Sequence, residues 1–62
     1  MMNKSEFASA CRKVLRANQK AQSLRSLLVE VGLTTLADRI EPIETDTRLA
    51  YNILIDLQVV ND

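Results

Sequence analysis

An unbroken heptad series dominates the first half of the chain. Apolar residues recur at alternating spacings of three and four from Phe7 to Val31, and the single glycine of the sequence, Gly32, follows directly. Such spacing places the apolar residues in one stripe along an α-helix, and a glycine after the last of them supplies the left-handed conformation with which many helices end. The pattern therefore predicts one long helix from about Lys4 to Val31, roughly 42 Å in length at 1.5 Å per residue.

The start of this helix carries its own signals. Asn3 is a preferred N-cap residue, and Glu6 stands three positions later, where a capping box has its acidic side chain. Met2 and Phe7 are spaced so that they can form a hydrophobic staple across the cap. We expect the helix to begin directly after Asn3.

A second, short helix is expected after the glycine. Thr34 or Thr35 can cap it, and its apolar pattern continues to Ile40. Pro42 disfavours helical geometry in the residue before it. The short helix is therefore expected to end near Ile40, with a turn over residues 42–44.

The last segment, residues 47–60, fits two structures. Capped by Thr45 or Asp46, it forms a helix with apolar residues on two sides; as a strand, its odd-numbered residues from Leu49 to Val59 form one apolar face. A strand would have no second strand in its own chain and would have to pair with another molecule, so helix is favoured. Either structure exposes more apolar surface than one neighbouring helix covers, which indicates self-association.

These segments predict an all-α fold with a single domain, residues 1–62. A long helix, a short helix and a returning helix form a helical hairpin, and hairpins pack into a homo-oligomer, most simply a dimer that resembles a four-helix bundle. A domain of this size buries only about 60% of its unfolded surface, and one cysteine excludes an internal disulfide, so association is the remaining way to stabilise it. The residues expected between chains are Phe7, Ala10, Val14, Ala17, Ala21, Leu24, Leu28, Val31, Tyr51, Ile53, Ile55 and Leu57.

The residue types that enzymes need are scarce. The chain has no histidine, its only glycine cannot form a phosphate-binding loop, and Cys11 lacks a histidine to activate it as a nucleophile. One thiol without histidine does not make a zinc site. We expect no enzymatic activity, no cofactor and no metal, and Cys11 is interpreted as a small apolar side chain. With no apolar run of about 20 residues and no signal-peptide pattern at the start, we expect a cytoplasmic protein.

Charge is divided unevenly between the two halves of the chain. Residues 1–31 hold six basic and two acidic side chains, whereas residues 32–62 hold two and six, and the net charge is zero. The basic side chains Arg12, Lys13, Arg16 and Lys20 form a stripe on the first helix. This stripe is solvated surface, or it faces the acidic half of a second chain, or it binds phosphate.

The function expected from this sequence is binding of another protein. As a homo-oligomer, the chain would be a small regulator, inhibitor or adaptor without enzymatic activity. The alternative is a nucleic-acid-binding regulator, of the size seen in plasmids and phages, that uses the basic stripe of its first helix. The acidic half of the chain and an isoelectric point near 6.2 make the alternative the weaker of the two.

Overall fold

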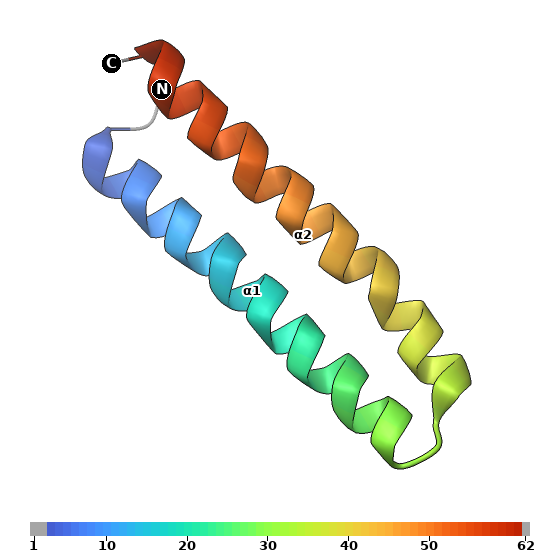
Figure 1. The fold of residues 1–62 in the computed structure, drawn as a ribbon. Coiled ribbons are helices and arrows are strands. Elements are labelled where there is room, and N and C mark those ends of the chain that lie inside the picture. Colours follow the sequence, from blue (N-terminus) through green and yellow to red (C-terminus); the bar gives the residue numbers. More distant parts are fainter. Residues whose placement is uncertain (1–2, 62) are drawn as a thin grey trace.

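The computed structural model describes residues 3–61, and the surroundings of side chains up to Leu57. Over this range the chain is a helical hairpin, in which α1 (Lys4–Glu30) and α2 (Thr34–Asn61) pack against each other in opposite directions (Figure 1). The hairpin is a rod whose backbone extends 46 × 16 × 14 Å. The expected all-helical hairpin is confirmed.

The first helix begins as its sequence signals indicate. The Asn3 side-chain oxygen Oδ1 accepts a hydrogen bond from the backbone N–H of Glu6 at 2.8 Å, and the Asn3 carbonyl accepts from the N–H of Phe7 at 2.9 Å. The first bond satisfies an N–H group of the first turn that has no backbone partner in the helix, and the second is the first backbone hydrogen bond of the helix. The expected staple to Met2 lies outside the described residues.

The first helix also ends at the glycine. Gly32 has a φ of 85°, a conformation that residues with a side chain rarely adopt. The N–H of Leu33 donates to the carbonyl of Leu28 at 2.8 Å, which is the long hydrogen bond of a Schellman motif. The chain thus reverses direction within three residues, and the last helical residue is Glu30 instead of Val31.

The second half of the chain is one continuous helix. The expected break near Ile40 and the expected turn over residues 42–44 are wrong, because α2 runs from Thr34 to Asn61 with Pro42 inside it. Thr45 and Asp46 therefore lie within α2 and do not cap a separate helix.

Packing on both sides of Pro42 accounts for this continuity. A proline within a helix removes one hydrogen bond and costs about 3 kcal/mol. The turns before and after Pro42 both contact α1, since Ile40 and Thr47 are half-buried and Glu44 is buried. A break at the proline would lose the contacts of one side, so tertiary packing outweighs the local preference.

The end regions of α2 complete the comparison. Its last part is helical, as favoured above, and the strand alternative for residues 47–60 is wrong. Its first hydrogen bond joins the N–H of Ala37 to the carbonyl of Leu33 at 3.0 Å. Thr34 and Thr35 consequently belong to the first turn of α2 and are not its N-cap.

The two helices meet along a seam with heptad spacing, whose positions are named a and d. Every seam residue described is buried or half-buried. Only Ala21 and Ala37 are buried apolar residues among those described, and no large side chain there is fully buried. The seam consists of Phe7, Cys11, Val14, Asn18, Ala21, Arg25 and Leu28 from α1, with Ala37, Ile40, Glu44, Thr47, Tyr51 and Leu54 from α2.

Candidate interaction surface

An exposed apolar face lies beside this seam. In an antiparallel pair of helices the g positions of both helices flank the seam on the same side, and the e positions flank it on the other. All eight g positions of the heptad series hold apolar residues, which we call the apolar face: Ala10, Ala17 and Leu24 from α1, its C-cap Val31, and Leu36, Ile43, Ala50 and Leu57 from α2. Its five large side chains are 44–58% exposed.

The opposite side of the seam has a mixed composition. Its e positions include Leu15 and Val29, which are exposed, but also the exposed polar residues Gln22, Glu41 and Arg48. Charged side chains are depleted from the centres of protein interfaces. Other large apolar residues are exposed too, among them Leu27, Leu33 and Leu49. Outside the seam, however, only the g positions are apolar throughout, which makes the apolar face the side best suited to apolar contact.

The structure divides the apolar heptad series predicted on the first helix between the seam and the apolar face. Phe7, Val14, Ala21 and Leu28 occupy d positions against α2, and the remaining four, Ala10, Ala17, Leu24 and Val31, occupy g positions on the apolar face.

The four residues predicted for the interface from the last segment are also distributed. Tyr51 is half-buried in the seam and Ile55 is half-buried at an e position. Ile53 is 51% exposed on the outer side of α2, and Leu57 belongs to the apolar face. The structure brings only Leu57 together with the g residues of α1.

A buried polar cluster in the seam was not anticipated from the sequence. Asn18 is 7% exposed, and its Nδ2 donates to the carbonyl of Glu44 at 2.8 Å and to Oγ1 of Thr47 at 2.9 Å. Its Oδ1 accepts from Nε2 of Gln22 at 2.6 Å. Buried polar groups that are fully hydrogen-bonded favour one register of a coiled coil over others. The sequence signal was an asparagine at heptad spacing from a basic residue, Arg25.

Arg25 completes this cluster. Its Nε donates to the Glu44 carboxylate oxygen Oε1 at 2.9 Å, and the side chains are 39% and 7% exposed. The hydrogen bond and the charge of Glu44 raise the pKa of Arg25 above its ordinary value. The pair joins α1 to α2, and Glu44 would otherwise be a buried charge without a partner.

The predicted basic stripe lies on the outer side of α1. Arg12, Lys13, Arg16 and Lys20 occupy b, c and f positions, away from the seam, and all four are exposed. Among the residues that the structure describes, Arg25–Glu44 is the ion pair that connects the helices. The stripe is therefore open to solvent in the single chain.

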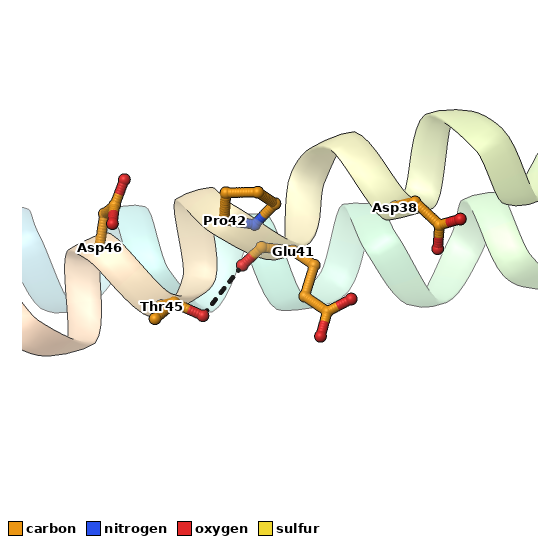
Figure 2. Close-up of a pocket in the computed structure, with 5 residues that line it drawn as sticks. All are labelled: Asp38, Glu41, Pro42, Thr45 and Asp46. Atoms are coloured by element: carbon orange, nitrogen blue, oxygen red, sulfur yellow. Dashed lines mark hydrogen bonds between the residues drawn. The ribbon is translucent and has the colours of Figure 1, made fainter.

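A shallow depression of about 330 Å³ lies on α2 around the proline (Figure 2). Asp38, Glu41, Pro42, Thr45 and Asp46 line it, and each of these side chains is exposed. The Thr45 hydroxyl donates to the carbonyl of Glu41 at 3.3 Å. The depression is an acidic, solvated part of the α2 surface.

Other kinds of site were sought across the described residues. Cys11 is a half-buried free thiol in the seam. Within residues 3–61, no group of histidine, cysteine and acidic side chains is arranged to hold a metal ion. Neither α1 nor α2, over the part described, is apolar enough along its length to span a bilayer.

Comparison with known proteins adds no assignment to these surfaces. The chain matches no known protein family, no curated protein and no solved structure.

Proposed function

We propose that this chain is a non-enzymatic, cytoplasmic regulator or adaptor that associates with itself and binds another protein. One observation carries the proposal: the apolar face leaves five large side chains 44–58% exposed, whereas the buried apolar residues among those described are two alanines. A hairpin of two helices gains little from such a core, and contiguous apolar surface is typical of protein interaction sites.

The test of self-association is a measurement of stability against concentration. Assembly linked to folding makes the thermal midpoint rise with protein concentration. We expect such a rise over a hundred-fold range of concentration, together with a sedimentation coefficient above that of a 7.0 kDa monomer. A stable monomer whose midpoint is independent of concentration would contradict the proposal.

The test of protein binding needs a defined partner. Proteins captured by the tagged chain from its source cell are candidates, and each is then purified and titrated with the chain. A complex of fixed stoichiometry, formed from the two purified proteins, supports the proposal. If no captured protein binds when purified, the adaptor function is contradicted.

The exposed basic stripe favours a second candidate, binding of nucleic acid. Arg12, Lys13, Arg16 and Lys20 are exposed on one side of α1, and clustered basic side chains bind phosphates with an affinity that falls steeply as salt rises. Titration with DNA and RNA at two salt concentrations distinguishes the candidates. The matched variant replaces Arg12, Arg16 and Lys20 with glutamate. Submicromolar binding near physiological salt that this variant loses would favour the second candidate.

A further inference from the structure

The hairpin exposes more surface than a compact protein of its mass. Its accessible surface is 4962 Å², whereas folded monomers of 7.0 kDa expose about 4,000 Å² on average. The excess of about 900 Å² is close to the roughly 800 Å² that each partner buries in a standard protein interface. The apolar face is the side on which burying that area would remove the most hydrophobic surface from water.

Two identical hairpins can pair face to face with two-fold symmetry in two orientations. In the lengthwise orientation the symmetry axis runs along the helices, so that α1 of one copy lies on α2 of the other. In the crosswise orientation the axis is perpendicular to the helices, so that each helix lies antiparallel on the same helix of the other copy. The distribution of side-chain sizes over the apolar face distinguishes between them.

Small residues gather toward the open end of the hairpin, where α1 begins and α2 ends. From their positions in α1 and α2, all three alanines of the face, Ala10, Ala17 and Ala50, lie toward that end beside Leu57, whereas Leu24 and Ile43 lie nearer the loop. The lengthwise orientation would bring Ala17 and Ala50 of both copies into one layer, and Leu24 and Ile43 of both copies into the next. A layer of four alanines beside a layer of four larger side chains leaves a void or holds the helices apart, and protein interiors tolerate neither well.

The crosswise orientation matches small residues with large ones. A two-fold axis through the centre of the apolar face places Ala17 of one copy over Leu24 of the other, and Ala50 over Ile43. Every layer then contains small and large side chains, so the two hairpins stay evenly spaced along their length. Alternation of this kind is how well-packed helical cores fill their volume.

We propose that the apolar face is the docking site for a second copy of this chain, and that the two copies pair in the crosswise orientation. The result is an antiparallel four-helix bundle whose new core consists of the g positions. This inference rests on the proposed self-association and adds to it the surface, the partner and the orientation.

Charged residues at the edge of the apolar face favour the lengthwise orientation, but only weakly. Lys20 and Asp46 flank the apolar face and are exposed. The lengthwise orientation would bring them together between copies, whereas the crosswise orientation brings each near its own counterpart. Exposed pairs of charges are screened by water and salt and contribute little. Filling of the core therefore decides the orientation.

Disulfide cross-linking tests the orientation directly. In a Cys11→Ala background, A17C/L24C places two thiols on each copy that face the other copy only in the crosswise orientation. An equal mixture of the single variants A17C and A50C, called A17C/A50C below, brings thiols of two copies face to face only in the lengthwise orientation, and no chain of this mixture can form a bridge within itself. Residues 17 and 24 of the same copy are about 10.5 Å apart along the helix at 1.5 Å per residue, too far for a bridge within one chain. The matched control is L15C/Q22C, which has the same spacing on the opposite side of the seam.

After mild oxidation, the covalent dimer is measured on a denaturing gel. We expect dimer as the main product of A17C/L24C and none from A17C/A50C or the control. Dimer from A17C/A50C alone would overturn the crosswise orientation while leaving self-association in place. A dimer in sedimentation without either cross-link would overturn the docking site, and a monomer in sedimentation would overturn the proposed function as well. If reduced A17C/L24C lacks wild-type helicity by circular dichroism, A10C/V31C tests the same orientation one layer away.

Discussion

Truncation of Asn18 tests whether the buried polar cluster stabilises the hairpin. In Asn18→Ala, two hydrogen bonds between the helices are lost, those at 2.8 Å to the carbonyl of Glu44 and at 2.9 Å to Oγ1 of Thr47. The remaining partners are not left buried without a hydrogen bond. Oγ1 of Thr47 still donates to the carbonyl of Ile43 at 2.7 Å, and Gln22, whose Nε2 donates to Asn18 Oδ1 in the wild type, is exposed and can bond water instead. At about 1 kcal/mol for each bond between helices, we expect the free energy of unfolding to fall by about 2 kcal/mol.

A double-mutant cycle isolates the contact between the helices. Thr47→Val keeps the shape of the side chain but removes the hydroxyl that accepts from Asn18. If this bond contributes about 1 kcal/mol, the double variant should lose about 1 kcal/mol less free energy of unfolding than the sum of the losses in the two single variants. Urea unfolding followed by circular dichroism measures all four proteins, at one protein concentration because assembly affects the result.

Asn52→Ala is the control for this cycle. Asn52 is exposed on the outer side of α2, so its truncation should change the free energy of unfolding by less than about 0.5 kcal/mol. The reasoning is refuted if Asn18→Ala is as stable as this control, or if Asn18→Ala and Thr47→Val are simply additive. Either outcome would mean that the polar cluster does not couple α1 to α2.

Three further substitutions test the loop, the proline and the ion pair by thermal unfolding. Gly32→Ala should destabilise the hairpin by about 1 kcal/mol, because φ is 85° while an added Cβ meets no atom within 4 Å, and a variant as stable as wild type would contradict the left-handed conformation. Pro42→Ala should stabilise it by up to about 3 kcal/mol by restoring a hydrogen bond to the carbonyl of Asp38, and a loss of stability would argue against a continuous α2. Arg25→Met should destabilise the chain because it leaves the Glu44 carboxylate buried without its partner, and adding Glu44→Met should restore stability. An Arg25→Met variant as stable as wild type would show that the pair does not contribute to folding.

The sequence predicts α1 well because its signals are local. The cap at Asn3 and the left-handed Gly32 act on residues within one turn, and the structure has both. Pro42 is a local signal too, but here contacts across the seam outweigh it, since Ile40 and Glu44 hold the turns on both sides against α1. The sequence predicts a broken second helix because those contacts join residues far apart in the sequence and leave no local signal that offsets the proline.

The face of α1 that packs within the chain could be predicted only in part. Apolar spacing identifies the d positions, such as Val14 and Ala21. The seam also needs a second row of residues along the helix, and this row can lie on either side of the d positions. Hydrophobicity favours the side with Ala17 and Leu24. The structure uses the side with Asn18 and Arg25, whose polar groups are satisfied by α2, and such pairing is not visible in one helix alone.

The loop and the open end of the hairpin lie at opposite ends of a 46 Å rod (Figure 1). If two copies pair crosswise, the open end of each lies beside the loop of the other. Groups attached at the open ends would then be kept apart by roughly the length of the rod. Such a dimer is a rigid spacer, which would hold two attached domains at a fixed distance and keep them from contacting each other. Fluorophores at Ser5 of each copy would transfer energy less efficiently in this arrangement than in lengthwise pairing, which would place them at the same end.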